Sequence, residues 1–277
     1  MLIRLGYDIE FQVAAGAPMI AHLNVHPART PDLLEPDLLR LDPPVEVEQY
    51  VDSFGNLATR FLLPPGRVRI YNSTLIHDSG QLDAQNPGAE EVPVERLPAE
   101  TLRYLLASRY CEVDLLMNTA SQLFGSAPRG WGRVQAVCEW VHRNVTFGYH
   151  FARSNRTALE VYAERVGVCR DFQHLAVTFC RCLNIPARYA TGYLGDIGVP
   201  LTPPMDFSAW FEAHLDGRWW TFDARHNAPR IGRVLIGVGR DATDVAITTS
   251  FGNAELARFD IVADEVSDGQ MLTELSA

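Results

Sequence analysis

Apolar and polar residues alternate over long stretches of the first third of the chain. The clearest case lies near the N-terminus, where every second residue from position 5 to position 13 is a large apolar one. Alternation with this period predicts β-strands that have one buried face. The same pattern covers residues 19–25, 45–51, 57–63, 67–71 and 73–82, with a tight turn at 52–56. Short strands separated by turns predict an antiparallel β-sandwich over residues 1–95.

The spacing of the apolar residues changes after a polar linker at 83–98. From there it follows steps of three and four, which are typical of amphipathic helices. Predicted helices begin near residue 98, cover residues 131–141 and follow a capping-box pair at Thr157 and Glu160. Strand patterns return at 187–194, 208–215, 218–223, 233–238, 245–249 and 255–263. Helices followed by consecutive strands predict a separate α+β domain over residues 96–277.

Cys169 stands at the start of the most regular helical pattern. Five apolar residues follow it at helical spacing, namely Phe172, Leu175, Ala176, Phe179 and Leu183. Pro186 ends this helix by about residue 184. A thiol on the first turn meets unpaired backbone N–H groups and the positive end of the helix dipole, and both favour the thiolate. The pattern alone leaves two interpretations of Cys169 open, a nucleophile or a small core residue.

Composition and charge argue against several kinds of partner. The 277 residues include 24 basic and 34 acidic side chains, for a net charge of −10, and they lack the basic cluster that is typical of nucleic-acid binding. The five cysteines show neither a disulfide framework nor zinc-ligand spacing, which favours a reducing compartment and predicts no metal. The sequence has no phosphate-binding motif and no apolar run of membrane-spanning length. We therefore expect a cytoplasmic protein without a cofactor.

A hairpin is predicted around the Asp-Gly pair at 216–217. If these two residues are the loop, Ser208 and Trp210 share one face of the hairpin with Asp223, whereas the opposite face is apolar. Asp223 is then a diagonal neighbour of position 208, about 5–8 Å away. A carboxylate there could orient a base at position 208. That base would face Cys169 if the preceding helix packs over this sheet.

Two segments resemble one known family. The first contains Cys169 and reads GVCRDFQHLAVTFCRCLNIPARYATGYL; the second contains Asp223 and reads DFSAWFEAHLDGRWWTFDARHN. They are similar to the nucleophile segment and to the His and Asp segment of the bacterial transglutaminase-like family, whose fold is related to papain-like cysteine peptidases. Residues 240–245 also resemble the family's downstream sequence. The first half of the chain is similar to the β-rich region that often precedes the family's core domain.

The resemblance implies a transglutaminase-like core in which the nucleophile helix packs on an antiparallel sheet. It also implies acyl transfer on a protein or peptide substrate, in which the Cys169 thiolate attacks a carbonyl and water or an amine resolves the thioester. The backbone N–H of Cys169 would help to stabilise the oxyanion, and Asp223 would take the family's acidic position. Independently of the resemblance, Trp210 and Tyr193 either line a substrate groove or fill the core, which is the commoner role of aromatic residues.

The chain departs from the family at one position, because Ser208 stands where the family usually has histidine. A serine hydroxyl cannot accept a proton at neutral pH as an imidazole does. His226 follows Asp223 by three residues, so a loop could fold it back as a substitute base. His214 lies about 20 Å from position 208 at strand rise and is at the wrong end. His174 is about 140° round the helix from the thiol and should point away.

Two hypotheses follow from this departure. In the first, the protein is a transglutaminase-like hydrolase or transferase that uses Cys169 and Asp223, with either Ser208 or a recruited His226 as the third residue. In the second, the domain has lost its chemistry and serves as a binding or scaffold module. Arg225, which is opposite position 208 in the predicted hairpin, could pair with Asp223 in a purely structural ion pair.

Overall fold

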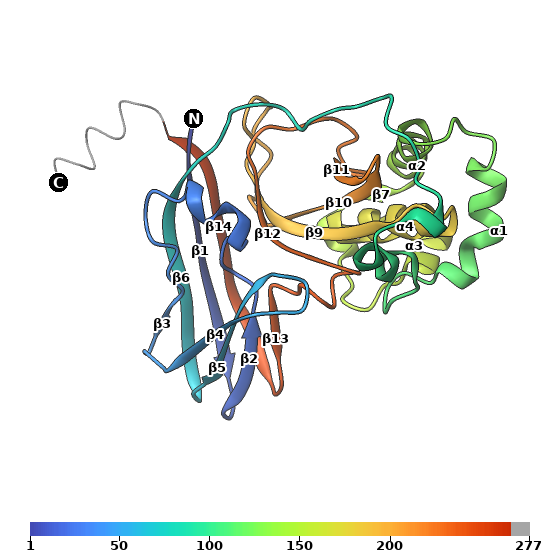
Figure 1. Cartoon of the computed structure of the whole chain (residues 1–277). Coiled ribbons are helices and arrows are strands. Elements are labelled where there is room, and N and C mark those ends of the chain that lie inside the picture. The colour runs from blue at the N-terminus through green and yellow to red at the C-terminus, as the bar shows by residue number, and fades with distance from the viewer. Residues whose placement is uncertain (267–277) are drawn as a thin grey trace.

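The first part of the chain forms a β-sandwich, which confirms the interpretation of the alternating pattern. The computed structural model describes residues 1–266. Its first strands are β1 (Leu2–Val13), β2 (Ala17–Ala21), β3 (Arg40–Asp42), β4 (Val47–Val51), β5 (Leu57–Leu63) and β6 (Gly66–His77). One sheet has the order β14-β1-β6-β3 and the other the order β13-β2-β5-β4 (Figure 1). The strands predicted at 67–71 and 73–82 are one continuous strand, β6.

The last two strands return to this sandwich, so the predicted division at residue 95 is wrong for the end of the chain. Strand β13 (Thr248–Ser250) pairs with β2, and β14 (Ala254–Val266) pairs with β1 along its whole length. An alternating pattern shows that a segment is a strand but not which sheet edge it joins, because side-chain period is the same at every edge. The segment between β6 and β13 is therefore inserted between strands of the sandwich.

The inserted half holds the helices and a third sheet. The 3-10 helix η1 (Pro27–Asp32) still belongs to the first part of the chain, between β2 and β3. The inserted half begins with the 3-10 helices η2 (Val94–Arg96) and η3 (Ala99–Leu105). These are followed by α1 (Val113–Phe124), α2 (Trp131–Asn144), β7 (Thr146–Phe147), η4 (Tyr149–Phe151), α3 (Ala158–Glu164), β8 (Val166–Gly167) and α4 (Cys169–Cys182). The sequence analysis did not predict α1, although its buried residues Leu116, Ala120 and Phe124 stand at helical spacing. The capping box predicted at Thr157 and Glu160 begins α3.

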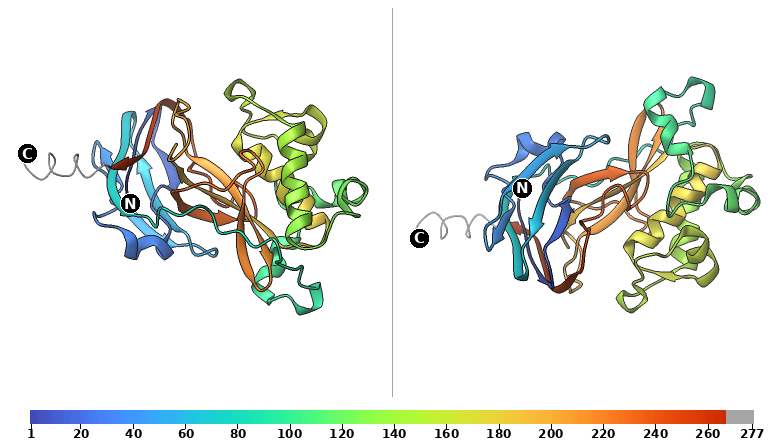
Figure 2. Two further views of the ribbon diagram at one scale, coloured as in Figure 1. Left: turned by 90° about the horizontal axis from the view of Figure 1, so that it is seen from above. Right: turned by 90° about the horizontal axis from the view of Figure 1, so that it is seen from below.

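The third sheet lies between the sandwich and the helices. Its strands are β9 (Ala187–Leu194), β10 (Ser208–Leu215), β11 (Arg218–Phe222) and β12 (Arg233–Gly239), in the order β11-β10-β9-β12. One face packs on α4, where Phe179 and Leu175 share a core with Phe211 and Ala213. Tyr193 and Val234, on β9 and β12, share a core with the sandwich. Figure 2 shows the three layers, with the helices and the sandwich on opposite sides of this sheet.

The β10–β11 hairpin has the predicted register. Leu215 pairs with Arg218 across the loop, and Phe211 pairs with Phe222. Both loop residues have positive φ angles, 49° at Asp216 and 75° at Gly217, as a two-residue turn between twisted strands requires. The register places Asp223 directly after the end of the edge strand β11, where a side chain can be reached from both faces of the sheet.

The start of α4 is fixed by a buried carboxylate. Asp171 accepts a hydrogen bond from the Val168 backbone N–H at 3.0 Å, which satisfies one of the free donors of the first turn. The Asp171 carboxylate also forms ion pairs with Arg156 and Arg170, each at 3.1 Å. Together these contacts hold Cys169 as the first residue of the helix.

Candidate active site

Cys169 lies on the first turn of α4 and is partly exposed. It packs against Tyr189, Ala209 and Val245. Burial raises the pKa of its thiol to about 11, even though the positive charge of Arg225 and the backbone N–H of the next residue act in the opposite direction. The helix terminus does favour the thiolate, as expected, but the cost of desolvating the anion is larger, so the resting thiol is neutral at pH 7.

This pKa gives a testable prediction about thiol chemistry. Below a pKa of about 11, the thiolate fraction rises about tenfold per pH unit, so alkylation of Cys169 by iodoacetamide should become about 100-fold faster from pH 7 to pH 9. Peptide mass spectrometry would measure the rates, with Cys182 as the internal control, since it is also partly exposed and burial raises its pKa to about 12. A rate that is already constant between pH 7 and pH 8 would contradict the prediction.

Asp223 is the centre of a hydrogen-bond network at the edge of the third sheet. Its side chain is 2% exposed. Oδ1 accepts bonds from Gln173 Nε2 at 3.1 Å and from the backbone N–H groups of Arg225 and His226 at 2.9 and 3.1 Å. Oδ2 accepts a bond from Arg233 at 2.9 Å. The Arg233 guanidinium and the donated hydrogen bonds hold the pKa of Asp223 well below its usual range, despite the opposing effect of burial.

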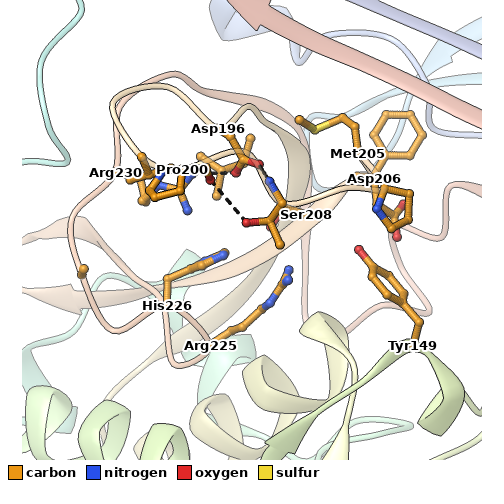
Figure 3. Close-up of a pocket in the computed structure, with 15 residues that line it drawn as sticks. Tyr149, Asp196, Pro200, Met205, Asp206, Ser208, Arg225, His226 and Arg230 are labelled. Carbon is orange, nitrogen blue, oxygen red and sulfur yellow. Dashed lines mark hydrogen bonds and ion pairs between the residues drawn. The ribbon is translucent and has the colours of Figure 1, made fainter.

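His226 folds back onto this carboxylate. Its Nδ1 lies 2.8 Å from Asp223 Oδ2. Because Asp223 is ionised and can only accept, Nδ1 carries the proton of this contact, and in the neutral ring Nε2 is the nitrogen with the free lone pair. The imidazole also lines a pocket, where it lies beside Arg225 (Figure 3). The chain after β11 thus folds His226 back onto Asp223, which was one of the alternatives that the sequence left open. In the tautomer with the proton on Nδ1, Nε2 can accept a proton.

Ser208 lines the same pocket as His226 but does not complete a Cys–Ser–Asp arrangement. It is buried, and within residues 1–266 its Oγ has no hydrogen-bond partner. By the alternation of β10, Ser208 lies on the same sheet face as Trp210, whereas α4 packs on the Phe211 face. The expectation that the helix would cover the face of Ser208 is therefore wrong.

Trp210 and Tyr193 do not line a groove. They are 2% and 1% exposed, respectively. Trp210 packs with Ala190 and Val238, and Tyr193 belongs to the core that joins the sheet to the sandwich. The substrate-groove assignment is thus corrected to core packing. By the register of β9 and β10, the two side chains lie on opposite faces of the sheet, and both are covered.

The other predicted partners have structural contacts. His174 Nε2 accepts a bond from the Ala242 backbone N–H at 3.1 Å, and the ring stacks on Tyr110 at 5.0 Å between centroids. His214 is buried, with its ring 5.1 Å from that of Trp219. Arg225 does not pair with the Asp223 carboxylate through its guanidinium, as the sequence had suggested as an alternative.

Arg233, and not Arg225, forms the ion pair with the Asp223 carboxylate. Its guanidinium reaches Asp223 from β12 across the face of Trp210, with its charged carbon 5.1 Å from the ring centroid. It also pairs with Asp83 at 2.9 Å. Gln173 reaches the same carboxylate from the opposite side, on α4, and binds the Ala209 carbonyl and the Ala224 N–H as well. Sequence reasoning missed both residues, since neither pairing crosses neighbouring strands.

The pocket beside these residues has a volume of about 400 Å³. Its polar lining comes from three segments: Tyr149 on η4, Asp206 and Ser208 at the start of β10, and Arg225 and His226 after β11. Figure 3 shows Tyr149, Arg225 and His226 directed into this space. Cys169 is not one of the lining residues, but Arg225 and Asp206, which are, both act electrostatically on its thiol.

The described part of the chain also limits other kinds of site. Among residues 1–266, no three histidine, cysteine, aspartate or glutamate side chains are grouped closely enough to hold a metal ion. Within the same range, no helix combines the length and apolar character that crossing a bilayer requires.

A cysteine on the first turn of a helix that packs on an antiparallel sheet, with a buried acid at the sheet edge, defines the fold class of transglutaminase-like and papain-related cysteine proteins. The comparisons with known proteins agree. Residues 118–224 match the model of the transglutaminase-like superfamily. The structure superimposes on the crystal structure of a "Putative Cysteine Protease" from Cytophaga hutchinsonii with a TM-score of 0.85 and 31% sequence identity, over 96% of this chain and 91% of that one. This chain belongs to the transglutaminase-like superfamily.

Two further similarities are more distant. "Uncharacterized protein ML0607" from Mycobacterium leprae is 24% identical over 215 residues, which are 74% of this chain and 75% of that protein. The periplasmic domain of TgpA from Pseudomonas aeruginosa has a TM-score of 0.40 at 12% identity, over 80% of this chain and 88% of that one. The family predicted from the two sequence segments is confirmed, and so is the α+β fold with a β-rich first part.

Proposed function

We propose that this protein is a transglutaminase-like thiol hydrolase or acyltransferase, in which Cys169 is the nucleophile and the Asp223–His226 pair supplies the general base. The observation that carries the proposal is the 2.8 Å contact between His226 Nδ1 and Asp223 Oδ2. A carboxylate that holds an imidazole in one tautomer is how cysteine and serine hydrolases orient their base. The chain thus offers an imidazole a few residues after the acid, although Ser208 replaces the one expected on β10.

The chemistry begins from a neutral thiol, because the pKa of Cys169 is about 11. His226 Nε2 takes the thiol proton, directly or through one water, as the sulfur attacks the substrate carbonyl carbon. The oxyanion of the tetrahedral intermediate is stabilised by the Cys169 backbone N–H. The imidazolium then protonates the leaving amine as the C–N bond breaks and the thioester forms. Water or a second amine then gives a proton to the imidazole as it attacks the thioester. The C–S bond breaks, and the imidazolium protonates the departing thiolate, which restores the neutral thiol and imidazole.

Asp223 and its other partners support this step. Its ionised carboxylate stabilises the imidazolium that forms at His226, and the bond from Gln173 ties that carboxylate to the helix that carries Cys169. The Ser208 hydroxyl, which lines the pocket without a hydrogen-bond partner in the described part of the chain, would hold the water that attacks the thioester. Neither role requires Ser208 to act as a base.

The substrate that fits this chemistry is a protein or peptide. The support is the relative from Cytophaga hutchinsonii, which is described as a cysteine protease. The cytoplasmic location remains a prediction from the cysteines: all five are free thiols in the structure, as a reducing compartment favours. Neither a cofactor nor a nucleic acid enters the proposed reaction.

The second candidate is a binding or scaffold module without catalysis. Two observations favour it: Ser208 stands at the family's histidine position, and burial makes Cys169 a neutral thiol at pH 7. A protein of this kind would keep the pocket for recognition alone. The Asp223–His226 pair would then only hold the loop after β11 in place.

Labelling by a thiol-directed electrophile tests the proposal. At pH 8, an acrylamide- or vinyl-sulfone-type reagent should modify Cys169 at least about tenfold faster than Cys182, because its thiol is more acidic and is assisted by a base. Cys111, Cys138 and Cys180 are buried and should react only after unfolding. In His226→Gln the advantage of Cys169 over Cys182 should shrink. Equal rates for the two partly exposed cysteines in the wild type would favour the scaffold.

A further inference from the structure

Arg225 differs from most of the buried or half-buried arginines near the candidate site. Arg156, Arg170, Arg230 and Arg233 each lie within 4.0 Å of a carboxylate. Arg225 has no such ion pair with any of the residues 1–266, and its side chain is only half-buried. The unpaired guanidinium lines the pocket next to His226.

The position of this guanidinium is fixed by aromatic side chains. Its central carbon lies 3.8 Å from the centroid of the Phe147 ring, a cation–π contact. Its charge also lowers the pKa of the Tyr149 hydroxyl, against the larger opposing effect of burial. Both aromatic residues belong to the segment that leads to the Cys169 helix, so the positive charge is held in place without being neutralised. In Figure 3, Arg225 lies between His226 and Tyr149.

The charge also lies close to the candidate reaction centre. Of the charged groups that lower the pKa of the Cys169 thiol, Arg225 has the largest effect. The other cation of the pocket, Arg230, is already paired with Asp196 at 3.4 Å. Asp206 is the remaining acid of the pocket; burial raises its pKa, and the charge of Arg225 acts against this rise without an ion pair within 4.0 Å. The pocket therefore offers, in Arg225, a positioned donor of five N–H groups that no carboxylate of residues 1–266 contacts directly.

From these contacts we infer that Arg225 selects the acyl donor by binding a carboxylate next to the carbonyl that Cys169 attacks. This inference rests on the proposed function and names its substrate class: peptides that carry a carboxylate beside the reacting bond, as an acidic side chain or as a free C-terminus. A guanidinium binds a carboxylate through two parallel hydrogen bonds, and such charge-assisted bonds are stronger than neutral ones. A bound substrate carboxylate would form with Arg225 the ion pair that none of the residues 1–266 forms with it.

Binding of short peptides to the Cys169→Ala protein tests the inference without requiring turnover. Isothermal titration would compare three peptides: Ac-Gly-Glu-Gly-NH2, Ac-Gly-Gln-Gly-OH and the neutral Ac-Gly-Gln-Gly-NH2. At least one of the two carboxylate peptides should bind about tenfold or more tightly than the neutral one. The carboxylate peptide that binds more tightly than the neutral peptide shows whether the side chain or the C-terminus supplies the carboxylate. The preference should disappear in Cys169→Ala/Arg225→Gln.

Matched variants separate recognition from structure. Arg225→Lys keeps the charge but not the paired donors and should retain part of the preference. Arg218→Gln removes an exposed arginine that stacks on Trp220, away from the pocket, and should leave the preference intact. The inference is overturned if neither carboxylate peptide binds at millimolar concentration, if the neutral peptide binds equally well, or if the preference survives Arg225→Gln. Failure of the proposed function would appear elsewhere, as loss of selective Cys169 labelling.

Discussion

Replacing His226 with glutamine should lower kcat for a peptide amide or ester substrate by about 10²–10⁴-fold, because proton transfer by a positioned base contributes a factor of this size. Glutamine keeps the size of the side chain and can still hydrogen-bond to Asp223, but it cannot take the thiol proton. Steady-state kinetics at pH 7 to 8 would measure the effect. Cys169→Ala sets the rate that remains without the nucleophile.

Ser208→Ala is the matched control for the base. If Ser208 only holds a water, kcat should fall much less than in His226→Gln. A result in the opposite order, with Ser208→Ala inactive and His226→Gln unchanged, would sink the assignment of His226. If the wild type has no activity that Cys169→Ala abolishes, and Ser208→His creates one, the protein is the binding or scaffold module.

Arg233→Met should lower the free energy of unfolding by about 3–5 kcal/mol, since removing one partner leaves buried opposite charges uncompensated. The Arg233 side chain is 6% exposed and lies between Asp223 and Asp83, which are 2% and 12% exposed. Methionine has a similar length but no charge, so the loss reports the ion pairs. Urea unfolding at pH 7, followed by tryptophan fluorescence, would give the value.

An exposed ion pair supplies the control for this effect. Arg258 is 46% exposed and pairs with Asp8 at 3.2 Å, so Arg258→Met should change the free energy of unfolding by less than about 1 kcal/mol. If Arg233→Met cannot be purified in folded form, Asp83→Asn removes one of the two pairs and should give a smaller loss. Equal effects of Arg233→Met and Arg258→Met would show that the buried network contributes little to stability.

Local patterns allowed much of the candidate site to be predicted. Side-chain alternation and the Asp-Gly turn gave β10 and its register with β11, and helical spacing gave the start of α4 at Cys169. The position of His226 also follows from local chemistry. An aspartate after a strand accepts bonds from the backbone N–H groups two and three residues on, and Asp223 does so with Arg225 and His226. That turn brings the imidazole back to the carboxylate.

What the sequence could not give is the environment of each sheet face. Parity separated Trp210 from Phe211, but it did not indicate that the helix would cover the Phe211 face. It also did not indicate that Tyr193 would join the core of the sandwich instead of lining a groove. The raised pKa of Cys169 depends on the number of atoms packed around the sulfur, which is a three-dimensional quantity. The Arg233–Asp223 pair spans strands that are far apart in the sheet order, and no local pattern predicts such a contact.

The pairing of β14 with β1 has a consequence for biosynthesis. Leu2 pairs with Val266 and Val13 with Ala254, so β1 cannot complete this pairing until residues 254–266 have been synthesised. A ribosome that has released only the first 250 residues leaves one side of β1 without its neighbour. Fragments that end before residue 254 should consequently expose a long apolar strand edge and aggregate, and the helical half should be difficult to obtain as an independent recombinant protein.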